Sequence, residues 1–212
     1  MGYMVNLVME GKAAVTVGGG EVAGRKVEDL LAAKATVTVV ALEACGRIAA
    51  LADDGRIELR RRAYETGDLE GAFAAIAATN DEALNARIAR DAMALKVLVN
   101  VVDRPALCTF TVPATVSRGD LTLAIATEGR CPALSGILRQ ELEGRYGPEY
   151  AVLVNLFAGL RQNMMALSWG SDRIREALSR LYRDGVMQPI ATGDREALRL
   201  FLRERLGAEF PL

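Results

Sequence analysis

Three consecutive glycines, Gly18 to Gly20, stand between an apolar run and a helix-like stretch, in the pattern G-x-G-x-x-A. Such a strand-to-helix turn suits the pyrophosphate of a dinucleotide, because glycines let the phosphates approach backbone N–H groups and the helix N-terminus carries partial positive charge. A glycine cluster after a strand is often only a loop, so the pattern alone is weak evidence. Here the flanking strand and helix signals match the fingerprint, and we expect a nucleotide site that contains Gly18 and Gly20.

The ribose of a dinucleotide is usually held by an acidic residue about 20 positions further on, at the end of the second strand. In this chain the second apolar run ends in Val-Val-Ala-Leu at positions 39–42, and the first acidic residue is Glu43. No arginine directly follows the run to bind a 2′-phosphate. We therefore expect NAD to be favoured over NADP. Side chains either recognise the ribose weakly, or Glu43 reaches it after a short loop.

Proton transfer is constrained by the complete lack of histidine. A carboxylate, Tyr, Lys, Cys or water must serve instead, and Ser–His pairs, Cys–His pairs and imidazole-ligated zinc sites are excluded. Asp103 directly follows the apolar run 97–102, so it should lie at the carboxyl end of a strand, where ligands bind in open α/β sheets, and face the same crevice as the glycine turn. Asp103 either ends the strand ahead of Pro105 or acts as a general base, and the lack of histidine favours the second interpretation.

The first half of the chain alternates strand and helix patterns, which predicts a parallel sheet covered on both faces. The expected strands are 13–17, 36–40, 56–59, 74–78 and 97–102. The expected helices are 21–33, 45–52 and a third that opens with a capping box formed by Thr79 and Glu82. The alternation stops after Pro113.

The second half is predicted to hold a β-hairpin and several helices. The hairpin strands are expected at 114–116 and 121–127 around the turn 117–120, and the helices from Pro132 and at 149–166, 172–184 and 194–206. A two-stranded hairpin is not stable alone, so it should join another sheet, in this chain or in a second copy. The fold class is therefore α/β: a Rossmann-type parallel-sheet domain at 1–113, a hairpin dimerisation region at 114–146 and a helical C-terminal domain at 147–212.

The composition is that of an ordinary globular protein. Of 212 residues, 51% are hydrophobic and 25% charged, with a net charge of -1, so nothing points to nucleic acid as a partner. The N-terminus lacks the pattern of a signal peptide, and we expect no membrane partner. Cys45, Cys108 and Cys131 are odd in number and widely spaced, which suits reduced thiols in a cytoplasm and no metal site.

A series of short motifs runs through about residues 3–145. They are VGGGEVA at 17–23 with RK at 25–26, AATND at 77–81, NVVD at 100–103, FTVPA at 110–114, RGDL at 118–121 and AIAT at 124–127 with Gly129. Taken together, they resemble the precorrin-2 dehydrogenase / sirohydrochlorin ferrochelatase family, the module that forms the N-terminal part of siroheme synthase. The set is much more specific than any one motif, and the last third of the chain matches only in its helical character.

The resemblance implies a homodimer with an NAD-binding Rossmann domain, a swapped dimerisation region and a small helical domain. It implies that precorrin-2 loses a hydride to NAD and protons to base or solvent, which yields sirohydrochlorin. The essential aspartate of the family falls on Asp103, and Arg118 and Arg130 are candidates for the substrate carboxylates, with plain surface charge as the alternative. The NAD contacts of the family fall on Gly20, Glu21, Val22, Leu42, Glu43 and Thr79.

Two departures from the family pattern bear on further activities. A serine that some members carry is Thr127 here, and the following loop 128–132 differs as well, which puts control through that serine in doubt. Many chelatases use imidazole to remove pyrrole protons and hold iron, whereas bifunctional members of this family are thought to rely on the aspartate. We expect a dehydrogenase that leaves iron insertion to another protein. The competing hypothesis is a regulatory Rossmann domain that senses NAD(H) without turnover.

Overall fold

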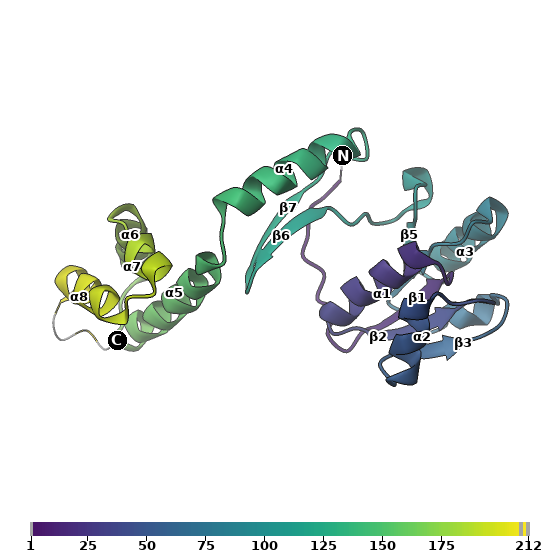
Figure 1. Cartoon of the computed structure of the whole chain (residues 1–212), viewed down its shortest axis with the longest axis horizontal. Helices are drawn as coiled ribbons and strands as arrows, with labels where there is room; N and C mark the ends of the chain where they lie inside the picture. Colours follow the sequence, from purple (N-terminus) through teal and green to yellow (C-terminus); the bar gives the residue numbers. More distant parts are fainter. Residues whose placement is uncertain (1, 208–209, 211–212) are drawn as a thin grey trace. The chain divides into compact units, whose positions relative to one another are not determined.

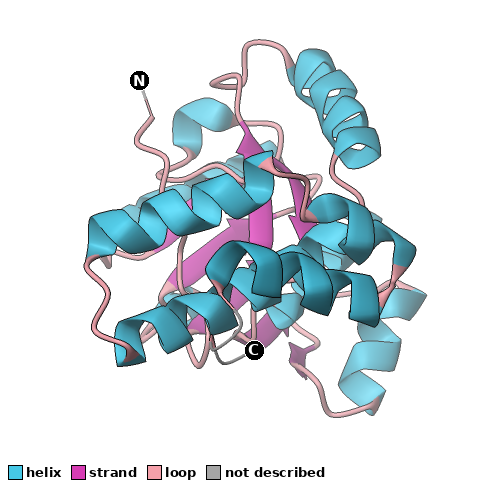
Figure 2. Cartoon of the chain, turned by 90° about the vertical axis from the view of Figure 1, so that its left-hand side faces the viewer, coloured by secondary structure: helices cyan, strands magenta, loops and turns pink. Residues whose placement is uncertain are grey.

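The computed structural model describes residues 2–207 and 210, and the chain divides into two compact units that meet between Val112 and Pro113. The first unit is an α/β sheet domain, and the second combines a β-hairpin with helices (Figures 1 and 2). The predicted fold class is thereby confirmed. The division into three domains, with boundaries at 113 and 146, stays a proposal.

The first unit is built on a five-stranded parallel sheet in the order β3-β2-β1-β4-β5. Its strands are β1 (Ala13–Val17), β2 (Thr36–Val40), β3 (Glu58–Arg60), β4 (Ala74–Ala77) and β5 (Leu98–Val101). Small and β-branched residues dominate these strands, as suits a sheet that is covered on both faces. From β1 the chain runs outward through β2 and β3 and then crosses to β4, so the order reverses between β1 and β4. Ligands of open α/β sheets bind at the carboxyl side of such a reversal.

Helices cover the two faces of this sheet with two separate apolar clusters. The helices α1 (Glu21–Ala32) and α2 (Gly46–Asp53) pack on one face, where Val27 and Ile48 are fully buried. The helix α3 (Glu82–Ala94) packs on the other face through Ile88. Two short 3₁₀ helices, η1 (Thr66–Leu69) and η2 (Pro105–Leu107), lie in the connections.

The predicted capping box at the start of α3 is wrong. The N-cap of this helix is Asp81, whose side chain accepts a hydrogen bond of 3.0 Å from the backbone N–H of Leu84. Thr79 lies two residues earlier, in the turn that leaves β4, and its hydroxyl lies 2.8 Å from Oδ1 of the buried Asn85. The helix therefore begins two residues later than the sequence pattern indicated. Thr79 stabilises the turn between β4 and α3 and does not cap the helix.

The second unit begins with the antiparallel pair β6 (Ala114–Arg118) and β7 (Leu121–Ile125). Arg118 pairs with Leu121, so the turn is the tight Gly119–Asp120 and not the predicted four residues; Gly119 has a φ of +58°. The helices are α4 (Pro132–Arg145), α5 (Glu149–Ala166), α6 (Ser171–Arg183), α7 (Met187–Thr192) and α8 (Arg195–Leu206). The six-residue α7 was not predicted, because Pro189 within it favours a loop. Among the described residues, no helix is long and apolar enough to span a membrane.

Candidate functional site

A cleft of about 770 Å³ opens at the carboxyl ends of the sheet strands. Its walls are the glycine turn after β1 and the segments 41–45 after β2, 62–64 after β3 and 78–81 after β4, together with two side chains of α3. Five residues that the sequence assigned to the cofactor line this cleft: Gly18, Gly20, Leu42, Glu43 and Thr79. These five residues lie on the loops that follow β1, β2 and β4. The strands are parallel, so all three loops leave the sheet at the same edge and come together there.

The three glycines are needed for two different reasons. A Cβ on Gly18, which has a φ of +124°, would lie 2.3 Å from the carbonyl oxygen of Ala78, and one on Gly19 would lie 1.7 Å from that of Glu43. Side chains at these two positions would therefore collide with neighbouring backbone. At Gly20 no atom lies within 4 Å of the Cβ position. The absence of a side chain at Gly20 keeps space in the cleft open.

The glycine turn leads directly into the first turn of α1. Gly20 is the N-cap residue with extended backbone, and it provides no side-chain cap for the helix N–H groups. Glu21 and Val22 begin the helix but are not part of the cleft lining, and the Glu21 carboxylate lies 3.6 Å from Nε of Arg47. Uncapped N–H groups at a helix N-terminus favour a bound anion. The cradle thus fits the pyrophosphate of a dinucleotide.

The far wall of the cleft contains two arginines that the sequence reading missed. Arg62 donates hydrogen bonds of 2.8 and 2.5 Å to the two carboxylate oxygens of Asp68. The guanidinium of Arg87 lies 5.4 Å from the centroid of the Tyr64 ring, and its Nε lies 3.6 Å from Oδ2 of Asp91. Both guanidinium groups are thus paired with carboxylates. The run of three arginines at 60–62, next to the short predicted strand, was the available signal for this wall.

Asp68 anchors that wall as a buried carboxylate whose side chain is 1% exposed. The hydrogen bonds from Arg62, supported by the backbone N–H of Glu65 and by Arg60, lower the pKa of Asp68 to about 2. Burial raises the pKa of Tyr64 above its usual range, and its hydrogen bond to Asp91 adds to the effect. Asp68 therefore stays ionised over the physiological pH range. Its hydrogen bonds to Arg62 hold the segment 62–64 in place as a wall of the cleft.

Asp103 follows the outer strand β5 at the same edge of the sheet as the glycine turn, but it does not line the cleft. Its φ of +58° lies in the left-handed region, which non-glycine residues adopt infrequently. Within the described part of the chain its carboxylate forms no hydrogen bond or ion pair, while the neighbouring Arg104 pairs with Glu82. The carboxylate is exposed and available to a ligand.

The loop after Asp103 is tied back to β5 by three side chains. Cys108 Sγ accepts a hydrogen bond from the N–H of Val101 (3.1 Å), and Thr109 Oγ1 accepts one from the N–H of Val99 (2.7 Å). Asn100, the first residue of the NVVD motif, donates through Nδ2 to the carbonyl oxygen of Phe110 at 3.1 Å. These bonds hold both ends of the turn on which Asp103 sits.

Arg118 and Arg130, the candidates for substrate carboxylates, belong to the second unit. Arg118 donates to the carbonyl oxygens of Tyr146 at 2.7 Å and Glu143 at 3.2 Å, and so caps the C-terminal end of α4. Arg130 is exposed in the turn before α4. Their roles toward substrate stay predictions. The Thr127 hydroxyl lies 3.2 Å from that of Ser135, close to the same turn.

Comparison with known proteins places this fold and cleft in a family. A family model for NAD(P)-binding domains matches residues 5–114, and the chain belongs to this NAD(P)-binding family. Siroheme synthase of Pseudomonas entomophila (strain L48) is 43% identical over 159 residues, which are 75% of this chain and 34% of the relative. Siroheme synthase of Ectopseudomonas mendocina (strain ymp) is 36% identical over 203 residues, 96% of this chain and 44% of the relative. The chain thus spans less than half the length of these relatives.

A solved structure matches nearly the whole chain. The precorrin-2 dehydrogenase SirC superposes with a TM-score of 0.76 at 27% identity, covering 96% of this chain and 98% of that one. Together with the siroheme synthases, it confirms the resemblance to the precorrin-2 dehydrogenase / sirohydrochlorin ferrochelatase family that the sequence motifs predicted. A nicotinamide dinucleotide is the cofactor class that follows from this membership.

Proposed function

We propose that this chain is an NAD-dependent precorrin-2 dehydrogenase that converts precorrin-2 into sirohydrochlorin. The observation that carries the proposal is the side-chain-free turn at Gly20, which opens the uncapped N-terminus of α1 to a 770 Å³ cleft. The oxidation removes one hydride and a proton from the reduced tetrapyrrole, and NAD⁺, when bound, is the hydride acceptor. The chain must therefore hold the dinucleotide and accept a proton.

The proposed cofactor contacts follow the cleft from one wall to the other. Backbone N–H groups at Gly20, Glu21 and Val22 bind the pyrophosphate, as helix N-termini do. Leu42 and Glu43 contact the ribose, and Thr79 borders the opposite side. The position of Gly20, Leu42, Glu43 and Thr79 around one cleft supports this assignment, and Glu21 and Val22 follow Gly20 directly in the first turn of α1.

The choice of NAD over NADP is part of the proposal and has electrostatic support. A 2′-phosphate near Glu43 would meet a like charge. The two arginines of the far wall, Arg62 and Arg87, already pair with Asp68 and Asp91, and a phosphate would have to displace those carboxylates. We expect kcat/KM with NAD to exceed that with NADP by at least about tenfold, a difference of about 1.4 kcal/mol. Equal values for the two cofactors would overturn the preference.

Asp103 is the proposed proton acceptor. Loss of hydride leaves a cationic macrocycle, and a nearby carboxylate can stabilise that charge and take the proton. Its free carboxylate and its place at the sheet edge that bears the glycine turn support this role. The assignment is tested by measuring anaerobic turnover and NAD binding of the Asp103→Asn variant. In the natural chain, NAD binding without oxidation of precorrin-2 would instead identify a sensor, the competing hypothesis. Fe²⁺ or Co²⁺ added after turnover shows whether metal insertion follows.

The proposed partner is a second copy of the chain. The strands β6 and β7 form a sheet of two strands, each with one unpaired edge within the described residues. Such a ribbon gains stability by pairing with further strands. A homodimer built through this hairpin and a cytoplasmic location complete the proposal.

A further inference from the structure

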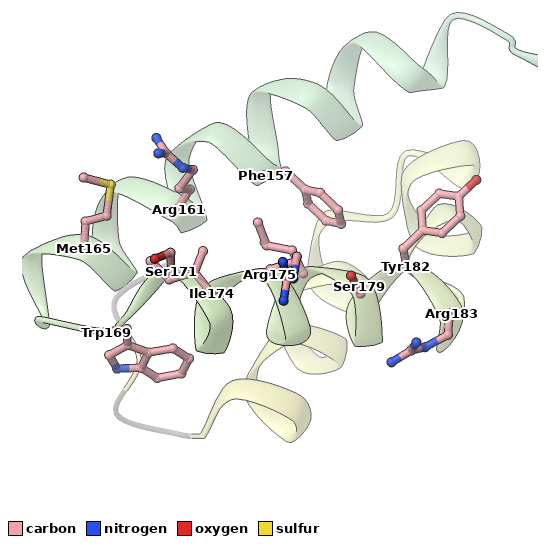
Figure 3. Close-up of a pocket in the computed structure, with 11 residues that line it drawn as sticks. Phe157, Arg161, Met165, Trp169, Ser171, Ile174, Arg175, Ser179, Tyr182 and Arg183 are labelled. Carbon is pink, nitrogen blue, oxygen red and sulfur yellow. The ribbon is translucent and has the colours of Figure 1, made fainter.

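The second unit contains a groove of about 880 Å³ between α5, α6 and the turn that joins them (Figure 3). Its floor is apolar and partly aromatic, with Ile174 buried and Phe157, Trp169 and Leu178 half-buried. Met165 lies at the edge of the groove and is 52% exposed. The volume falls within the range of small-molecule sites, roughly 300–1,000 Å³.

The rim of this groove is basic. Arg161 comes from α5, and Arg175 and Arg183 come from α6, on the other side of the groove (Figure 3). None of the described residues that line the groove is acidic. Asp172 and Glu176 of α6 pair with two of these arginines from outside the lining, so the charged side chains that line the groove itself are all basic.

The three guanidinium groups are available to a ligand. Arg161 forms no ion pair or hydrogen bond within the described part of the chain. Arg175 and Arg183 pair with the carboxylates of Asp172 at 2.9 Å and Glu176 at 2.8 Å, whose side chains are 91% and 71% exposed. Exposed pairs of this kind contribute about 0–1 kcal/mol, so a ligand carboxylate can replace them at little cost.

We propose that this groove is a second ligand site, which binds a flat, apolar macrocycle that carries several carboxylates. The half-buried Phe157 ring lines the groove and offers stacking surface to a flat ring system, and guanidinium groups bind carboxylates with two parallel hydrogen bonds. The Trp169 ring already carries the Arg173 guanidinium at 3.7 Å from its centroid, so it contributes apolar area to the groove. The residues that line the groove and those that line the cofactor cleft do not overlap, so the groove is proposed as a site that binds the ligand without taking part in its oxidation. That the physiological ligand is the tetrapyrrole rests on the proposed function.

A single tryptophan makes the site measurable, because Trp169 is the only one in the chain. The full chain is titrated with uroporphyrin, a stable planar porphyrin with carboxylates around its edge, and Trp169 fluorescence is followed. We expect saturable quenching, and we expect Arg161→Glu to weaken binding at least about tenfold, since it replaces a carboxylate-binding group by a repelling charge. The matched control is Arg199→Glu on α8, an exposed arginine outside the groove, which should change the Kd less than about twofold.

The comparison of the two variants is decisive, because uroporphyrin bound elsewhere could also quench Trp169 by energy transfer. Equal Kd values for the natural chain, Arg161→Glu and Arg199→Glu would overturn the groove site. Oxidation of precorrin-2 by Arg161→Glu is measured separately: an unchanged rate supports a groove site that is separate from the catalytic site, and a rate that falls in step with the loss of binding would overturn that separation. A chain that binds uroporphyrin through Arg161 but does not oxidise precorrin-2 would refute the proposed function and leave the groove site standing.

Discussion

Replacing Gly20 by valine should remove cofactor binding while leaving the fold intact. No atom lies within 4 Å of the Cβ position of Gly20, and its φ of −80° and ψ of 178° are accessible to any residue. Valine is a poorer N-cap than glycine, by about 1 kcal/mol or less. We therefore expect a folded variant whose Tm falls by only a few degrees.

The effect on the dinucleotide should be much larger. The valine side chain would occupy the space through which the pyrophosphate reaches the first-turn N–H groups of α1. Hydrogen bonds to a charged group contribute about 1.5–3 kcal/mol each, so the loss of two removes at least about 3 kcal/mol. The Kd for NAD should consequently rise by more than about 100-fold.

Isothermal calorimetry with NAD measures this directly. The matched control is Gly170→Val: Gly170 is the N-cap of α6, with a φ of −69°, a ψ of 155° and no atom within 4 Å of its Cβ position. The control should bind NAD like the natural chain. A folded Gly20→Val variant that binds NAD within about threefold of the control would refute the assignment of this turn to the pyrophosphate.

Three further results are expected. Asp103→Asn should lower the dehydrogenase rate at least about tenfold with NAD affinity little changed, because the amide keeps the shape but not the basicity, and near-normal turnover would leave Asp103 without a proton-transfer role. Light scattering should give the mass of two chains at micromolar concentration, and a monomer would exclude the hairpin dimer. The pKa of Asp68 is about 2, against 3.8 for the free side chain, so its ionised form stabilises the folded state by about 2 kcal/mol above about pH 4. This part of the free energy of unfolding should be lost as the pH falls toward about 2. Urea unfolding at several acidic pH values should show this loss in the natural chain and a flatter profile in Asp68→Asn.

The parts of the site that the sequence predicted are those set by local patterns. The apolar run of β1, the glycines and the stripe of α1 follow each other without interruption, so the turn between them was readable from one segment. The loop that carries Leu42 and Glu43 was placed correctly because β2 ends where its β-branched run ends. Parallel alternation then brought both loops to one edge of the sheet.

The parts that were missed depend on packing between distant segments. Arg62 reaches the cleft because β3 lies beside β2, and its orientation is set by Asp68, six residues later. The sequence offered Arg118 as a candidate for substrate carboxylates or as surface charge, and it did not predict that Arg118 caps α4 through Tyr146, 28 residues away. Asp103 was placed at the correct strand end, but its exposure outside the cleft lining follows from the left-handed turn after β5.

The central claim is tested most directly by incubating the purified chain with precorrin-2 and NAD under anaerobic conditions and recording absorbance spectra over time. We predict that NADH and sirohydrochlorin appear together in equal amounts, and that no conversion occurs without NAD. Tight binding of NAD with no formation of NADH in the presence of precorrin-2 would contradict the account and identify the chain as an NAD-binding domain without this activity.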